Sequence, residues 1–124
     1  MVLPDIFKYL QVDLCEKDKL NNVFKSVGPI DAVIHLAGLK AVGESVSKPL
    51  LYYETNLVAC LNLLNVMEKY KCFNLVFSSS ATVYGMGKPN PLTENTSVGP
   101  CTNPYGQYHL FHHPSDFSLA LECT

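Results

Sequence analysis

The chain contains no arginine, and its nine basic residues are lysines scattered along 124 residues. Eleven acidic residues bring the formal net charge to −2. Proteins that bind nucleic acids neutralise phosphates with basic residues gathered in a patch or stripe. Because this sequence has no such stripe, we expect no nucleic-acid partner.

Long apolar runs are missing as well, so no segment reaches the length that spans a bilayer. The first residues lack the basic start and apolar centre of a secretory signal. Five cysteines are scattered along the chain, and none forms a Cys-x-x-Cys pair. These absences predict a cytoplasmic protein with reduced thiols, no membrane contact and no metal site.

The sequence also lacks Gly-x-Gly-x-x-Gly, the turn whose amides and following helix hold a pyrophosphate in dinucleotide-binding folds. Gly85 and Gly87 come near this pattern, but Lys88 and Pro89 follow them and predict no helix start. The chain has no arginine that could take over the phosphate contacts. We therefore expect the chain itself to bind a dinucleotide weakly or not at all.

What is present is an alternation of short apolar runs with helical periods. The pattern predicts strands at 9–14, 31–38 and 73–77, and helices at 16–26 and 48–70. Such alternation is typical of an α/β fold with a parallel, doubly wound sheet. Residues 85–100, which are rich in glycine and proline, are expected to form a loop.

Apolar side chains recur at helical spacing in both predicted helices. The first helix should bury Leu20, Val23 and Phe24. In the second helix we expect a core-facing stripe at three- and four-residue steps, formed by Leu50, Tyr53, Leu57, Leu61, Leu64 and Met67. Asn56 interrupts the apolar pattern with an amide.

Hydroxyl groups gather where the third predicted strand ends, at Ser78, Ser79, Ser80 and Thr82. Ligands of open parallel sheets lie beyond the carboxyl ends of the strands. Tyr105 follows Pro104 and would open a helix that returns to this edge. A serine and a tyrosine converging there suggest proton transfer with a substrate hydroxyl. The alternative is a polar strand end and an unrelated turn tyrosine.

Two stretches carry a more specific pattern: His35-Leu-Ala-Gly-Leu-Lys-Ala-Val-Gly-Glu-Ser45, and Phe77-Ser-Ser-Ser-Ala-Thr-Val-Tyr-Gly85 read together with Asn103-Pro-Tyr-Gly106. Together they resemble UDP-glucose 4-epimerase, an extended short-chain dehydrogenase/reductase family. The resemblance runs from about Tyr9 to Gly106. It implies a partial Rossmann-like, NAD-binding domain over residues 1–106, without its central strands and Gly-rich turn. Residues 107–124 would be an unrelated, disordered tail.

The resemblance implies an isomerase that interconverts UDP-galactose and UDP-glucose through a 4-keto intermediate and bound NAD. Tyr105 would be the catalytic base and Ser80 its partner, while Ser78, Ser79, Thr82 and Lys40 would face the UDP-sugar. The cofactor-facing positions would be Asp13, Ala37, Gly38, Lys40 and Asn56. For Asp13 a cap of the following helix is the alternative, and His35 is expected to be a packed strand residue.

One departure from this family concerns its Tyr-x-x-x-Lys signature, in which lysine lowers the pKa of the tyrosine. Here the fourth position after Tyr105 is His109, which is largely neutral at pH 7. Tyrosine without such help, with a pKa near 10, is a poor base. We therefore expect an inactive fragment, splice variant or frame-shifted product, truncated at both ends. The alternatives are a non-catalytic piece that associates with intact subunits and another nucleotide-sugar enzyme such as a 4,6-dehydratase.

Loss of central strands has consequences for packing. Segment 9–14 would have to pair directly with 31–37 or remain loose. Val33, Ile34, Leu75 and Val76 should expose apolar surface and strand edges, which predicts self-association. Residues 31–84 should be the most ordered part, with 1–8 and 107–124 loose. The spacing of His109, His112, His113 and Cys123 fits no common zinc pattern.

Overall fold

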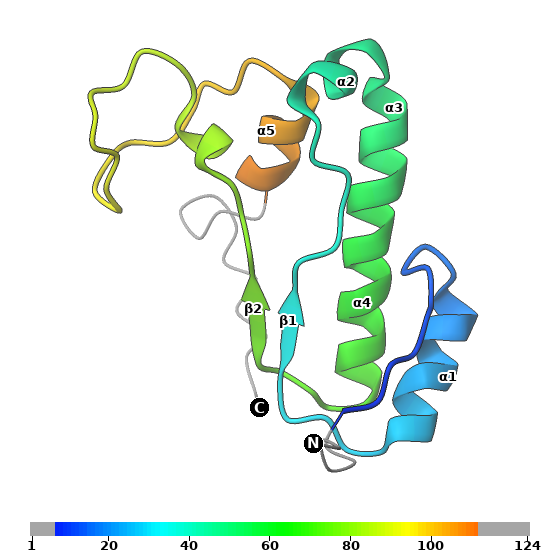
Figure 1. Cartoon of the computed structure of the whole chain (residues 1–124). Coiled ribbons are helices and arrows are strands. Elements are labelled where there is room, and N and C mark those ends of the chain that lie inside the picture. Colours follow the sequence, from blue (N-terminus) through cyan, green and yellow to red (C-terminus); the bar gives the residue numbers. More distant parts are fainter. Residues whose placement is uncertain (1–6, 112–124) are drawn as a thin grey trace, which may run out of the picture.

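The computed structural model describes residues 7–111 (Figure 1). A two-stranded parallel sheet is covered by helices, with α4 beside the sheet and α1 on the outer side of α4 (Figure 1). The elements in chain order are α1 (Lys17–Val27), β1 (Val33–His35), α2 (Val42–Ser47), α3 (Pro49–Tyr52), η1 (Tyr53–Leu57), α4 (Val58–Lys69), β2 (Leu75–Phe77), η2 (Ala81–Tyr84) and α5 (Pro104–Leu110).

The sheet confirms two of the three predicted strands and their parallel pairing. β1 lies beside β2 with Val33 opposite Leu75 and His35 opposite Phe77. Parallel neighbours cannot be joined by a tight turn, so the chain crosses over through α2, α3 and α4. Both strands are shorter than predicted, three residues each. Their carboxyl ends therefore lie at the same edge of the sheet.

The predicted strand at 9–14 is wrong, because this segment forms no strand and ends in a turn at Leu14. A strand needs a neighbour to satisfy its backbone, and within residues 7–111 the sheet has only β1 and β2. Other groups take over this role. The Asn62 side-chain amide donates to the carbonyls of Leu14 and Cys15, at 3.0 Å each. Val12 and Leu14 also pack against the core, so the segment is anchored without joining the sheet.

The long helix is confirmed as α3, η1 and α4 in succession, and η1 is a π-helical turn. The predicted core stripe is displaced, however. Leu50 is 73% exposed and Leu61 is 47% exposed, although Met67 is buried. The residues that are buried are Tyr52, Asn56, Ala59, Cys60, Leu63, Val66 and Met67. Both sides of this helix carry apolar residues at helical spacing. The prediction chose the wrong side because the side that packs inward includes the polar Asn56.

The core lies between α1, α4 and one face of the sheet. Leu20 and Phe24 of α1 meet Leu63, Val66 and Met67 of α4. This confirms the predicted apolar face of α1, with Val23 half-buried at its margin. Val33 and Leu75 contribute to the core from the sheet. Their neighbours in the strands, Ile34 and Val76, remain largely exposed on the other side.

Helix α5 continues through Leu110, so residues 107–110 are helical, contrary to the expectation that the chain is loose from 107 onward. The division into domains at residue 106 stays a prediction. Residues 1–6 and 112–124 lie outside the described part, and with them His112, His113, Cys123 and most of both expected loose ends. Among the residues that are described, no three His, Cys, Asp or Glu side chains come together as a metal site.

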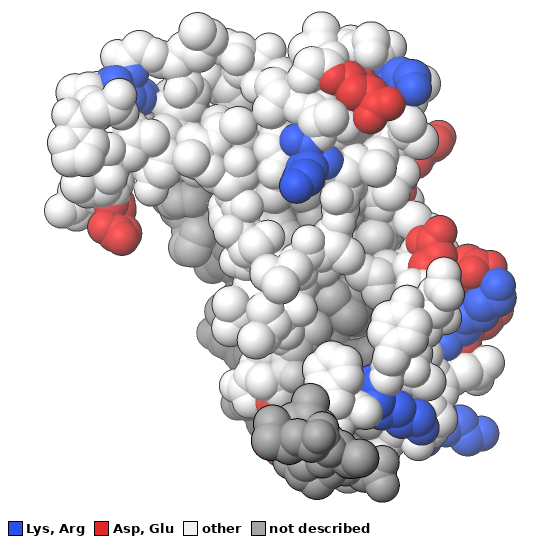
Figure 2. All heavy atoms as spheres, viewed as in Figure 1, with Lys and Arg blue, Asp and Glu red and all other residues white. Residues whose placement is uncertain are grey.

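Charged side chains are thinly spread over the face of the molecule seen in Figure 2. Figure 2 shows lysines and acidic residues as small separate groups of both signs, with uncharged surface between them. No helix within residues 7–111 is long and apolar enough to cross a bilayer.

Candidate functional site

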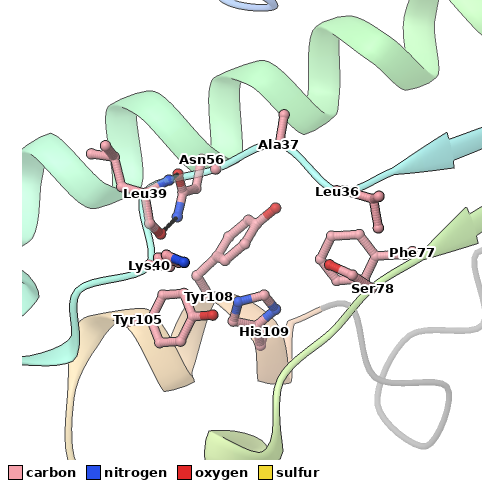
Figure 3. A pocket seen from close by; sticks show the side chains of 11 residues that line it. Leu36, Ala37, Leu39, Lys40, Asn56, Phe77, Ser78, Tyr105, Tyr108 and His109 are labelled. Atoms are coloured by element: carbon pink, nitrogen blue, oxygen red, sulfur yellow. Dashed lines mark hydrogen bonds between the residues drawn. The ribbon is translucent and has the colours of Figure 1, made fainter.

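A cavity of about 160 Å³ lies beyond the carboxyl ends of β1 and β2 (Figure 3). We call it the main cavity. The segment after β1 forms one side, α5 forms the opposite side, and the end of β2 completes the wall (Figure 3). The lining residues are Leu36, Ala37, Gly38, Leu39, Lys40, Asn56, Phe77, Ser78, Tyr105, Tyr108 and His109. The topology thus brings both motifs of the sequence to one place, as predicted for a parallel sheet.

Asn56 fixes the segment after β1. Its Oδ1 accepts from the Leu39 N–H at 2.8 Å, and its Nδ2 donates to the Leu39 carbonyl at 2.9 Å. A Cβ on Gly38 would lie 3.2 Å from Asn56 Oδ1, so this close approach favours glycine. Asn56 itself is buried in the π-helical turn η1. The amide that was expected to face a cofactor is therefore engaged by the protein backbone.

Tyr105 enters the main cavity from the first turn of α5 (Figure 3). Asn103 caps this helix, because its Oδ1 accepts from the Gly106 N–H at 2.7 Å. The His109 ring meets the Tyr105 ring edge-on, with centroids 4.5 Å apart. His109 also contacts Tyr108 and Phe77, at centroid distances of 4.8 and 5.5 Å. The position that the Tyr-x-x-x-Lys signature gives to lysine is therefore held by a buried histidine that packs among aromatic rings.

The hydroxyl run divides where the backbone turns. Ser79 has a φ of 49°, a left-handed conformation that is uncommon for serine. Before this turn Ser78 lines the main cavity. After it, Ser80 caps η2: its Oγ accepts from the Thr82 N–H at 3.3 Å and from the Thr82 hydroxyl at 3.0 Å. Tyr105, Lys40 and Ser78 thus share the main cavity, whereas Ser79, Ser80 and Thr82 are not among its lining residues.

A second cavity, of about 220 Å³, lies on the far side of Gly38 and Leu39. Its lining includes Asp13, Cys15, Ala37 and Thr55. The Asp13 carboxylate accepts from the Cys15 N–H at 2.8 Å, so it also shapes the turn that leads into α1. Burial, and then the neighbouring Asp13, raise the pKa of the Cys15 thiol. Two of the cofactor-facing candidates, Ala37 and Gly38, lie between the two cavities.

Tyr108 is a lining residue that the sequence analysis did not single out. Burial raises its pKa well above the usual value, and the nearby Cys60 thiol raises it further. Tyr108 therefore stays protonated and cannot serve as a base near neutral pH. Its position was readable from spacing, since a residue three places after Tyr105 shares the same helix face. Leu36 and Phe77 had a weaker signal, since they lie near the carboxyl ends of the strands predicted at 31–38 and 73–77.

Comparison with known proteins identifies the family to which the chain belongs. Residues 2–113 match the model of the NAD dependent epimerase/dehydratase family, and the chain belongs to that family. It is 57% identical over 101 residues to UDP-glucose 4-epimerase 2 of Arabidopsis thaliana, covering 82% of this chain and 28% of that protein. It is 49% identical over 104 residues to the Homo sapiens UDP-glucose 4-epimerase, covering 84% and 30%.

Solved structures agree with this assignment. UDP-glucose 4-epimerase from Bifidobacterium longum, crystallised in complex with NAD⁺ and UDP, superposes with a TM-score of 0.79 at 51% identity. The match covers 84% of this chain and 31% of that one. The observed fold is accordingly part of a Rossmann-like α/β architecture. The chain spans less than a third of the length of these relatives.

Proposed function

We propose that this chain carries the proton-transfer side of a UDP-sugar epimerase site, and that the 124-residue chain alone does not turn over substrate. The observation that carries the proposal is the position of Tyr105, which shares the main cavity with Lys40 and Ser78. Tyr105 would take the proton from a sugar hydroxyl. Lys40 and Ser78 would orient the substrate, with Ser79, Ser80 and Thr82 shaping the turn behind them. The names of the relatives support UDP-glucose as one substrate, and inversion of its sugar at C4 gives UDP-galactose as the other.

The described residues do not fit a whole NAD molecule. Asp13 in the second cavity could meet an adenine, and Lys40 in the main cavity could meet the opposite end of a dinucleotide. Between them runs the segment Ala37–Leu39, whose Leu39 amide already donates to Asn56. No Gly-rich turn with a following helix supplies amides for a pyrophosphate within residues 7–111. We therefore derive no hydride step for this chain, and we expect it to bind NAD weakly or not at all.

Two measurements test the chain as it stands. Calorimetric titration with NAD and with UDP-glucose should give no tight, saturable binding. Incubation with UDP-galactose and added NAD should give no UDP-glucose by chromatography. Saturable NAD binding or sustained turnover by this chain alone would overturn the second half of the proposal.

A chimaera tests the role of Tyr105. The described segment, with His109→Lys, is fused to the remaining segments of the Bifidobacterium longum enzyme, which was crystallised with NAD⁺ and UDP. We expect turnover of UDP-galactose in this chimaera and its loss on Tyr105→Phe. Tyr84→Phe, which alters a tyrosine outside the lining of the main cavity, is the matched control. Unchanged activity after Tyr105→Phe would remove Tyr105 from the proposed mechanism.

A second candidate function is association with another copy or with an intact epimerase subunit. The observation that favours it is exposed apolar surface on both the sheet and the long helix. Ile34 is 67% exposed and Val76 is 58% exposed, and Leu50 stands open on α3. Burial of such side chains on contact with another chain is favourable.

A further inference from the structure

Ser45 on α2 reaches the backbone of Tyr105. Its side chain is fully buried, and its Oγ accepts from the Tyr105 N–H at 3.3 Å. The Ser45 hydroxyl in turn donates to the Val42 carbonyl at 2.6 Å, which orients the oxygen. The first N–H groups of a helix have no partner inside the helix. In α5 the side chain of Asn103 takes the Gly106 N–H, and Ser45 takes the Tyr105 N–H from a different element.

The same helix α2 is tied to the wall of the main cavity. It begins at Val42, directly after the segment that Asn56 clamps at Leu39. The Tyr52 hydroxyl accepts from the Ala41 N–H at 3.1 Å and donates to Glu44 at 3.0 Å. The Ser45 N–H also donates to the Ala41 carbonyl at 3.0 Å. Two residues of backbone join Leu39 to Ala41, and hydrogen bonds of α2 then lead from Ala41 through Ser45 to the backbone of Tyr105.

Helix α5 is also held closely on its other side. A Cβ on Gly106 would lie 3.2 Å from the Thr82 carbonyl oxygen. The first turn of α5 is thus confined between η2 and α2. Ser45 and the close approach of Thr82 therefore both constrain the first turn of α5, which carries Tyr105.

We propose that Ser45 is a positioning residue for Tyr105, setting where the phenol stands relative to the segment Leu36–Lys40 of the main cavity. The effect of Ser45 on catalysis rests on the proposed function, in which Tyr105 must reach a substrate hydroxyl to transfer a proton. The hydrogen bond between Ser45 and the Tyr105 N–H can be tested without substrate. A missing hydrogen bond is therefore distinguishable from failure of the proposed function.

The test is residue-resolved amide hydrogen exchange on the full chain, read by mass spectrometry with electron-transfer fragmentation at low concentration. In the parent, the Tyr105 amide should exchange more slowly than an unprotected peptide. Ser45→Ala removes the acceptor, and we expect exchange at Tyr105 to accelerate about ten-fold, with Gly106 changing by no more than about two-fold. Ser45→Thr keeps the acceptor oxygen and should restore protection. Ser47→Ala alters an exposed serine of α2 whose Oγ donates to the Glu44 carbonyl, and should leave Tyr105 unchanged.

Three results would overturn the proposal. The first is exchange of the Tyr105 amide at the unprotected rate in the parent chain. This measurement does not depend on the folding of any variant. The second is equal acceleration of Tyr105, Gly106 and core amides in Ser45→Ala, which would indicate general destabilisation. The third is failure of Ser45→Thr to restore protection in a chain whose other amides exchange as in the parent.

Discussion

Position 109 is where this chain departs most clearly in chemistry from the Tyr-x-x-x-Lys signature. A lysine there would bring a charge beside Tyr105, whereas His109 brings a ring that packs among Phe77, Tyr105 and Tyr108. His109 is buried in that cluster. The surroundings of the side chain are therefore suited to a flat aromatic ring and offer an ammonium group little water.

We expect His109→Lys to restore no epimerase activity in the 124-residue chain. The introduced ammonium would also be desolvated, and the free energy of unfolding should fall by at least about 1.4 kcal/mol, the equivalent of one pKa unit. Urea denaturation and a UDP-galactose conversion assay measure the two effects. Gln107→Lys, at a half-buried position of the same helix, is the control and should cost less. Conversion of UDP-galactose by His109→Lys alone would show that the lysine is the decisive difference.

Asn56 shows what residue-level reasoning from the sequence can and cannot provide. Its departure from the apolar pattern marked it as special, and it does line the main cavity. The nature of its contacts was not readable, because Leu39 is distant in the chain and is brought near only by the crossover from β1. The different locations of Ser78 and Ser80 were not readable either. The left-handed turn between them falls at Ser79, and a glycine, which would have indicated such a turn, is absent from that position.

Removing the Asn56 amide should destabilise the chain even without any ligand. Asn56→Ala leaves the N–H and carbonyl of Leu39 without their partner, which we expect to cost about 1–3 kcal/mol. Asn65→Ala in α4 is the control, because that exposed amide bonds only within its own helix, to the Leu61 carbonyl. Urea unfolding followed by circular dichroism gives both values. Equal stability of Asn56→Ala and the parent would mean that the clamp contributes nothing to the fold.

At the scale of elements, α2 is a short helix held by side chains of Lys48, which caps its end, and of Tyr52 in α3. Glu44 bonds to Lys48 at 3.0 Å and accepts from the Tyr52 hydroxyl at the same distance. Lys48, followed by Tyr52, lowers the pKa of the Glu44 carboxyl. Because the folded state favours the charged carboxylate, its contribution to stability is present above the unfolded pKa, near 4.3, and is lost as pH falls through the folded value.

Glu44→Gln should therefore reduce stability more at pH 7 than at pH 3. Urea denaturation of the parent and the variant at both pH values measures the difference. In a Tyr52→Phe background, where one donor to Glu44 is absent, the pH dependence of the Glu44→Gln effect should be smaller. An effect of Glu44→Gln that is the same at pH 3 and pH 7 in both backgrounds would contradict this account.

Elements were predicted better than the contacts between them. The spacing of apolar residues and the positions of glycine and proline located α1, the long helix and both strands, because local sequence determines these features. The strand expected at 9–14 required a pairing partner, which local sequence cannot supply. The inward face of the long helix depended on α1 and the sheet packing against one of two apolar sides. Tyr52 and Cys60 are buried against other neighbours: the Tyr52 hydroxyl meets Ala41 and Glu44, and Cys60 lies beside Tyr108 of α5.

At the scale of the whole molecule, the described residues cover one face of the sheet and leave the other face open. Ile34 pairs in register with Val76, and the two exposed side chains stand together on the uncovered face. Val33 and Leu75, which were expected to be exposed with them, are half-buried against the core. Both strands also have one edge without a strand neighbour within residues 7–111. Open apolar faces and strand edges favour contact with another chain.

We expect the isolated chain to form oligomers at micromolar concentration. Ile34→Lys places a charge on the uncovered face and should shift the population toward monomer, as should Val76→Lys. Val27→Lys, at an exposed position that ends α1, is the control and should leave the distribution unchanged. Light scattering coupled to size-exclusion chromatography measures the mass. A monodisperse monomer for the parent chain would contradict the prediction.

The parallel pairing of β1 with β2 also bears on how the chain folds. The paired residues are separated by all of α2, α3, η1 and α4, so their contact closes a long loop. Closing it costs chain entropy before any strand hydrogen bond is gained, whereas a helix forms through neighbours a few residues apart. Folding should therefore be limited by the return of Leu75–Phe77 to Val33–His35. The main cavity, which needs both strand ends, would be among the last features to form.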